Sequence, residues 1–153
     1  MQLSDAVIAL VAAITAAFAH GPTLPRDALV AEGTWETRDL IRALAAVNEV
    51  ADRAFMERHF DSLPAFTAVG LRHVLPQYLT YSLENPRSEV TERIIFHLSP
   101  NDIESTYWRE RVEAFSPAQK QAICEYFRYM QAELVGEKYD DYLARARSVW
   151  GCE

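Results

Sequence analysis

Glycine is scarce in this sequence, with five residues among 153. An antiparallel β-sandwich needs many tight reversals, so this scarcity argues against a turn-rich β fold. Histidine is scarce too, and none of the four histidines stands four residues from another or forms a His-x-His pair. Because a zinc site needs three or four converging ligands and no local segment supplies them, we predict no metal and no cofactor.

Motifs for catalysis and phosphate binding are also missing. The sequence has no Gly-x-Ser-x-Gly elbow and no glycine-rich loop. Cys124 lies in an apolar helical pattern, where burial would raise the thiol pKa, the opposite of what a nucleophile needs. We expect Cys124 in the core and Cys152 in the tail, and no sequence feature supports a disulfide between them. We predict no catalytic residue and expect that the protein is not an enzyme.

Positive charge is outnumbered, with 15 Lys and Arg against 22 Asp and Glu and a formal net charge of −7. This balance repels phosphates, so it disfavours nucleic acid and anionic membrane surfaces as partners. It suits a basic protein partner, although plain solubility explains the same charge.

Long hydrophobic runs are limited to residues 6–19, which are nearly all apolar. Such a run near the start of a chain can be a secretory signal. However, no Lys or Arg precedes it, Asp5 stands where positive charge is usual, and the run is too short to span a bilayer. We therefore expect a core helix of a cytoplasmic protein, with no membrane contact.

Helical patterning is what the sequence has in abundance. Ser116-Pro117-Ala118-Gln119 is a capping box with Pro at the first helical position, and a stripe of apolar residues follows it to Leu134. Ser4 is placed to cap a first helix that ends near Ala19. Further helices are expected from 34 or 37 onwards, through 50–60, from 62, from 76 to 84, from 88, across 103–114 and over 137–149. These elements predict an all-α, compact single-domain bundle of about six to eight short helices spanning residues 1–153.

Three places in this pattern are less clear. Pro76 is expected to break or restart its helix, because proline cannot donate the backbone hydrogen bond. Residues 93–98 favour a helix, but they are β-branched enough for a short strand. Residues 21–34 read as an irregular connector, either a functional loop or a plain tether.

Several aromatic side chains are candidates for a partner surface. Adjacent rings on a helix point to different faces, so some are expected to be partly exposed, and Tyr, Trp and Arg are frequent interface anchors. Alternatively, the Tyr rings cover the core and keep only their hydroxyls in water. The partner-binding candidates, with two acidic neighbours in the last helix, are Tyr78, Tyr81, Trp108, Tyr129, Asp140 and Asp141.

An ordered set of short motifs runs through most of the chain. It includes Leu63-Pro64-x-Phe66, Val74-Leu75-Pro76-x-Tyr78-Leu79, Ile95-Phe96-x-Leu98-Ser99-Pro100 and Phe115-Ser116-Pro117-x-Gln119-x-x-Ala122-Ile123. With these motifs the chain resembles a bacterial domain-of-unknown-function family of small cytoplasmic helical proteins. The resemblance implies a compact helical domain and supplies no activity or catalytic residues.

Three functional hypotheses follow. The first is a non-enzymatic protein-binding module, in its narrower form an immunity or antitoxin-like protein that neutralises a toxin partner, which is expected to be basic. The second is a small helical ligand-binding domain or enzyme, with a pocket assembled from His59, Arg72, His73, Glu84 and His97. The third is a self-associating accessory protein that forms a homodimer through its aromatic surface.

Overall fold

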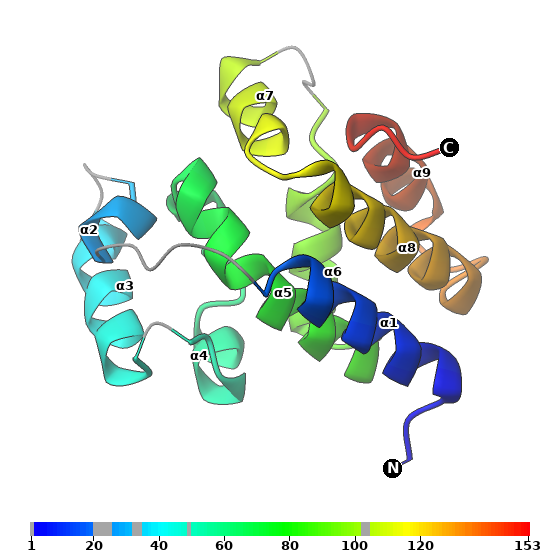
Figure 1. The fold of residues 1–153 in the computed structure, drawn as a ribbon, viewed down its shortest axis with the longest axis horizontal. Coiled ribbons are helices and arrows are strands. Elements are labelled where there is room, and N and C mark those ends of the chain that lie inside the picture. The colour runs from blue at the N-terminus through cyan, green and yellow to red at the C-terminus, as the bar shows by residue number, and fades with distance from the viewer. Residues whose placement is uncertain (1, 20–25, 32–34, 49, 102–104) are drawn as a thin grey trace.

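The fold consists of helices. The structure is a computed structural model, and it describes residues 2–19, 26–31, 35–48, 50–101 and 105–153. These residues contain no strand, only an isolated antiparallel bridge between Val30 and Phe66. The predicted all-α bundle is therefore confirmed. In chain order the helices are α1 (Asp5–Ala17), α2 (Arg26–Leu29), α3 (Trp35–Ala46), α4 (Arg53–Arg58), the 3-10 helix η1 (Leu63–Ala65), α5 (Ala68–Glu84), α6 (Glu89–His97), α7 (Thr106–Glu113), α8 (Pro117–Glu133) and α9 (Asp140–Val149) (Figure 1).

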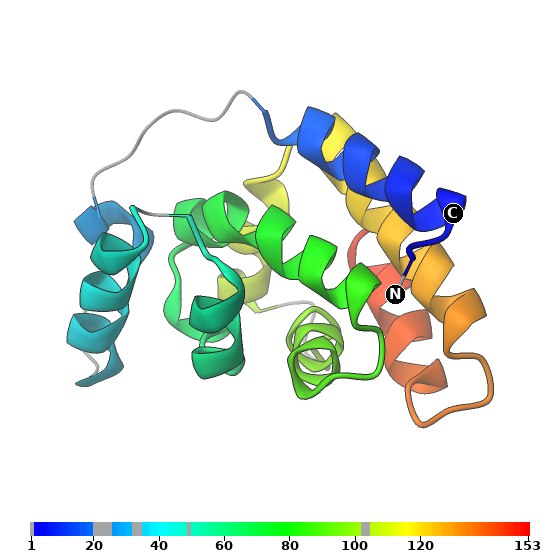
Figure 2. The same ribbon diagram turned by 90° about the horizontal axis from the view of Figure 1, so that it is seen from below.

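The central helix is α5, which packs against α1, α2, α6, α7 and α8 (Figures 1 and 2). It continues through Pro76, so the prediction that Pro76 breaks or restarts the helix is wrong. A proline in a helix interior costs about 3 kcal/mol. Leu75 and Leu79 lie on either side of it, fully buried, and each contributes about 1.5–3 kcal/mol by leaving water. Burial around the proline thus offsets the lost hydrogen bond.

The helix α8 begins as the sequence predicts. Ser116 Oγ accepts from the Gln119 amide at 3.1 Å, and Gln119 Oε1 accepts from the Ser116 amide at 2.9 Å, which completes the capping box. Its apolar stripe is fully buried against α1 on one side and α9 on the other. The first predicted helix is confirmed as well, with Ser4 Oγ accepting from the Val7 amide at 3.2 Å.

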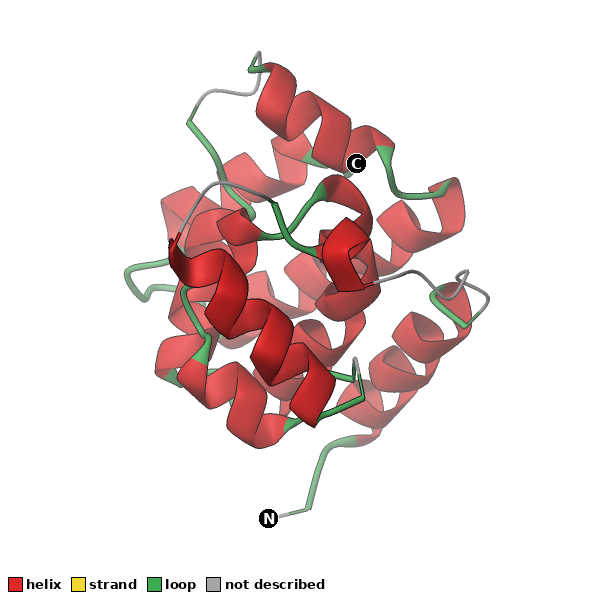
Figure 3. Ribbon diagram, turned by 90° about the vertical axis from the view of Figure 1, so that its left-hand side faces the viewer, coloured by secondary structure: helices red, strands yellow, loops and turns green. Residues whose placement is uncertain are grey.

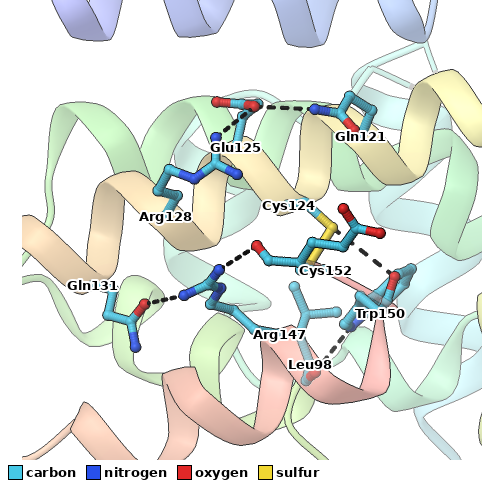
Figure 4. The surroundings of a disulfide bond; sticks show 10 residues. Leu98, Gln121, Cys124, Glu125, Arg128, Gln131, Arg147, Trp150 and Cys152 are labelled. Atoms are coloured by element: carbon cyan, nitrogen blue, oxygen red, sulfur yellow. Dashed lines mark hydrogen bonds and ion pairs between the residues drawn. A yellow bond between two sulfur atoms is a disulfide. The ribbon is translucent and has the colours of Figure 1, made fainter.

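The chain returns along α9, and a disulfide joins Cys124 in α8 to Cys152 in the tail (Figure 4). The Cα atoms of the two cysteines are 5.4 Å apart. The sequence pattern gave no support for this bond, because residues 28 positions apart meet only when α9 folds back on α8. Beside the disulfide, the buried indole of Trp150 donates to the carbonyl oxygen of Leu98 at 3.0 Å.

On the flank opposite α9, α2 and α3 extend the bundle (Figure 1), and this flank faces the viewer in Figure 3. The predicted irregular connector is therefore wrong for residues 26–29, which form α2, and residues 20–25 and 32–34 lie outside the described residues. The helix is attached by backbone bonds: the Thr67 amide donates to Leu29 O at 3.0 Å, and the Ala31 amide donates to Ala65 O at 2.8 Å. Propensity alone does not reveal a helix of four residues, because nucleation is costly and packing has to supply the stability.

The structure also shows the conformation of residues 93–97 and the start of α7. Residues 93–97 belong to α6, so the helix favoured over a strand is confirmed. The next helix, α7, begins at Thr106 with Ser105 as its cap. Residues 103 and 104, where the sequence predicts the start of this helix, lie outside the described residues. No helix within the described ranges has both the length and the apolar character to cross a bilayer.

Candidate functional site

Two of the predicted anchors are buried in the core. Tyr78 has no exposed surface, and its hydroxyl donates to the carbonyl oxygen of His59 at 2.9 Å. Burial raises the pKa of the Tyr78 hydroxyl. Tyr81 is also buried and donates to Glu57 Oε1 at 3.0 Å. The expectation that these two rings are partly exposed is wrong, because α5 is packed on several sides and both rings meet a neighbouring helix.

The other predicted anchors lie apart from one another. Tyr129 is half-buried on α8. Asp140 and Asp141 are exposed in the first turn of α9, where negative charge complements the helix dipole. Asp140 also accepts from the Gly136 amide, with 3.2 Å between the Gly136 nitrogen and Oδ2. Trp108 is half-buried on α7 and lines a groove to which none of the other five candidates contributes.

The residues proposed for a dispersed pocket do not converge on one site. Glu84 lines a cleft beside α1, whereas His97 lines the groove beside Trp108. Arg72 donates to the carbonyl oxygen of Ala114 at 2.9 Å. Over the described ranges, no three His, Cys, Asp or Glu side chains gather as metal ligands.

The groove around Trp108 has a volume of about 310 Å³ and lies between η1, α6, α7 and α9. Its most prominent rings are those of Phe96, 45% exposed, and Tyr107, 37% exposed. Exposed rings beside a guanidinium are typical of interface hot spots. We call this site the aromatic groove, and its lining residues are Pro64, Phe96, His97, Ser99, Pro100, Asn101, Tyr107, Trp108 and Arg145.

Tyr107 is held rigidly as one wall of the aromatic groove. Its hydroxyl donates to the carbonyl oxygen of Pro64 at 2.7 Å. The guanidinium of Arg111 lies over the ring, with 3.4 Å from Cζ to the ring centroid. Arg111 itself is only 7% exposed and donates to Phe66 O at 2.8 Å. A ring fixed before binding loses little conformational entropy when a partner covers it.

Two further guanidinium groups lie at the groove or beside it. Arg145 Nε donates to the carbonyl oxygen of Ser99 at 2.7 Å, which fixes the side chain at the edge of the groove. Arg93 lies over the Phe96 ring, with 4.6 Å from Cζ to the ring centroid. Phe96 also meets Tyr142 of α9 at 6.1 Å between ring centroids. This side of the groove therefore combines apolar area with hydrogen-bond donors.

A hydrogen-bonded cluster of Asp61, Arg93 and His97 holds His97 in place at the groove. Asp61 accepts from His97 Nε2 and from Arg93, both at 2.7 Å. Burial lowers the pKa of His97 more than its contact with Asp61 raises it, so the ring is neutral near pH 7. Partial burial raises the pKa of Asp61, but the bonds from His97 and Arg93 outweigh it and bring that pKa below its ordinary value.

This arrangement is suited to binding. The histidine–carboxylate pair orients an imidazole, but the nearby Ser99 hydroxyl is buried and donates to Ile95 O at 2.7 Å. A serine nucleophile needs its hydroxyl next to the base and open to a substrate. Sequence reasoning found Trp108 but missed Phe96, Tyr107 and Arg145. The neighbouring Tyr107-Trp108 pair was the one local signal for the groove.

Comparison with known proteins identifies a family. The sequence model described as "Family of unknown function (DUF6714)" matches residues 31–152. That segment contains α3 to α9 and every lining residue of the aromatic groove, whereas α1 and α2 precede it. No curated protein and no solved structure matches the chain.

Proposed function

Because the chain belongs to the DUF6714 family of unknown function, we propose its function from the geometry: it is a non-enzymatic protein-binding module that binds its partner through the aromatic groove. The observation that carries this proposal is the aromatic cluster of the groove, in which the exposed rings of Phe96 and Tyr107 lie beside the half-buried Trp108. Rings of this kind supply most of the binding energy in many interfaces.

The charges suggest the chemistry of the partner. The net charge of −7 speeds association with a basic protein over long distances. Beside the groove, Arg93 is paired with Asp61. Arg145, which lines the groove, donates through Nε to Ser99 O and lies over the Tyr142 ring, with 5.2 Å from Cζ to the ring centroid. The contact itself then favours an apolar or aromatic side chain flanked by a carbonyl or carboxylate oxygen that accepts from Arg145.

A narrower form of the proposal is an immunity or antitoxin-like protein that neutralises a toxin in the bacterial cytoplasm. Small size and acidity support this form. The cytosol keeps most thiols reduced, so at that location Cys124 and Cys152 are expected as a dithiol. Alkylation of freshly lysed cells, followed by mass spectrometry, distinguishes the dithiol from the disulfide.

The proposal is tested by quantitative capture of partners from the native cells. The unaltered protein is expected to retain a stoichiometric partner, and Trp108→Ala is expected to weaken its affinity by roughly 30-fold, the loss typical of a hot-spot ring. Val135→Ala removes an exposed apolar side chain outside the groove and serves as the control.

Two results would contradict this function. One is the absence of any stoichiometric partner, and the other is a partner that binds Trp108→Ala as tightly as the unaltered protein. Light scattering at two concentrations tests self-association in the same samples. A dimer that Trp108→Ala dissociates would identify the partner as a second copy of the chain.

A further inference from the structure

A second cleft lies between α1, α4 and α5 and shares no lining residue with the aromatic groove. Its volume is about 540 Å³, which falls in the range of small-molecule sites, roughly 300–1,000 Å³. We call it the α1 cleft, and its lining residues are Val11, Thr15, Phe18, Ala19, Ala51, Arg53, Met56, Pro76, Gln77, Thr80, Tyr81, Glu84 and Asn85.

The inner part of the α1 cleft is apolar. Phe18 from the end of α1 and Pro76 from α5 face it from two sides, and Met56 of α4 contributes a third. Along α5 and its C-cap the lining residues come in adjacent pairs repeated every four positions, 76/77, 80/81 and 84/85, so they share one face of that helix. The cleft therefore runs along α5.

The outer part of the α1 cleft is acidic. Arg53 is neutralised by Glu57, with 2.8 Å between Nε and Oε1. Glu84 is exposed at the cleft and makes no ion pair with the described residues. Glu57 does not line the cleft, but with it counted two carboxylates stand against one guanidinium, which leaves one uncompensated negative charge at Glu84.

One cationic side chain of the protein, Arg53, already lies at the α1 cleft. The guanidinium of Arg53 lies over the Tyr81 ring, with 5.7 Å from Cζ to the ring centroid. The charge of Glu84 acts on this guanidinium together with that of Glu57. Because Tyr81 is buried and Arg53 lies over its ring, Glu84 is the lining group that would attract a second cation.

We propose that the α1 cleft binds a small organic cation with an apolar body. The cationic group lies at Glu84, near the Tyr81 ring, and restores charge balance. The apolar body lies against Phe18, Met56 and Pro76. The family segment begins at residue 31, so the wall formed by α1 lies outside it, and this binding site is a property of α1 and the family segment together.

The experiment uses three probes with one shared body, 4-phenylbutylamine, 4-phenylbutanol and 4-phenylbutyrate. Each is titrated into the full-length ¹⁵N-labelled protein, and backbone amide shifts are followed at Val11, Thr80 and Glu84. The amine is expected to give saturable shifts with a Kd of about 1 mM, reasonable for so small a ligand. The alcohol is expected to bind at least about fivefold more weakly, and the butyrate to give no saturable shift.

Two variants change the affinity in opposite directions. Glu84→Gln removes the uncompensated charge and is expected to weaken amine binding about fivefold, whereas Arg53→Gln adds net negative charge and is expected to tighten it. Glu89→Gln removes an exposed carboxylate that does not line the cleft and is expected to leave the Kd unchanged.

The proposal is overturned by any of three results. They are no saturable shift with the amine, equal affinities for the amine and the alcohol, or an unchanged Kd in Glu84→Gln. Trp108→Ala must leave amine binding intact, so a failure of the α1 cleft and a failure of the aromatic groove are distinguishable.

Discussion

The helices α2 and α9 lie at opposite flanks of the bundle and are attached to it by different means (Figure 1). Polar backbone groups attach α2, through the bonds from Thr67 and Ala31 and the bridge between Val30 and Phe66. This contact requires Gly70 on α5, because a Cβ there would lie 1.8 Å from the carbonyl oxygen of Leu29.

The attachment of α9 depends on apolar packing. Leu143 and Ala146 are fully buried, Trp150 follows them into the core, and the disulfide fastens the tail to α8. Packing of this kind degrades gradually, since each side chain contributes its own buried area. The α2 contact does not weaken gradually in this way, because one methyl group added at Gly70 prevents the close approach of Leu29.

The largest effect is expected from Gly70→Ala. In an ordinary helix interior this change stabilises the protein by about 1 kcal/mol. Here α2 has to move away, which breaks its backbone bonds and exposes part of Leu29 and Val30, so we expect a loss of about 4 kcal/mol. Urea unfolding measures it. Gly136→Ala is the control, since no atom lies within 4 Å of the added Cβ and the positive φ alone costs about 1 kcal/mol.

The next effect is expected on the other flank, from Cys152→Ser. The disulfide closes a segment with a sequence separation of 28, and its loss is expected to lower the free energy of unfolding by about 3 kcal/mol. Thermal unfolding with and without dithiothreitol measures this loss. In the reductant, the variant and the unaltered protein should unfold at the same temperature. A persistent difference would mean that the serine itself disturbs the packing.

A smaller loss is expected from Thr67→Val, which tests the α2 contact without steric blockage. Thr67 Oγ1 accepts from the Gly70 amide at 2.9 Å and donates to Ala28 O at 2.6 Å. Removing both bonds is expected to cost about 2 kcal/mol in the free energy of unfolding. Thr67→Ser keeps the hydroxyl and should cost less than about 0.5 kcal/mol. A loss in Thr67→Ser as large as that in Thr67→Val would show that the methyl group contributes as much as the hydroxyl, which contradicts the prediction.

The smallest effect concerns the contact between Asp61, which precedes η1, and His97 of α6, which belongs to neither flank. The pKa values of His97 and Asp61 are both lower in the folded protein than their ordinary values. The unfolded chain then binds protons more readily, so stability falls on acidification, first as the pH drops below about 6.5 and again below about 4. Urea unfolding between pH 7.5 and pH 5.5 is expected to show the first loss, and His97→Asn should remove most of it.

The two flanks also differ in how much of them the sequence predicts. The capping box at Ser116 and the apolar stripe that follows it locate α8 correctly, because caps and periodicity are local properties. Nothing local indicates that Gly70 touches Leu29, since a glycine inside a helical pattern suggests only a weaker helix. Pro76 misled for a similar reason: the sequence shows its cost but not the burial on either side.

The candidate sites follow the same rule. Trp108 is recognisable as an anchor from its residue type, but the groove that it lines also needs residues from η1, α6 and α9. Tyr78 and Tyr81 have the same residue type as a surface anchor, and only the central position of α5 explains their burial. Helix pairing is a tertiary property, so the pattern of apolar residues does not determine it.

The Arg111 guanidinium that lies against the Tyr107 ring affects which side chains the aromatic groove favours. Arg111 covers one face of the ring, so the positive charge is already in place before any partner arrives. A lysine or arginine on the other face would meet a like charge about 7 Å away, a repulsion on the order of 2 kcal/mol at an effective dielectric constant of about 20. In contact with the basic partner proposed above, this repulsion would favour apolar side chains of the partner over its cationic ones at the Tyr107 ring.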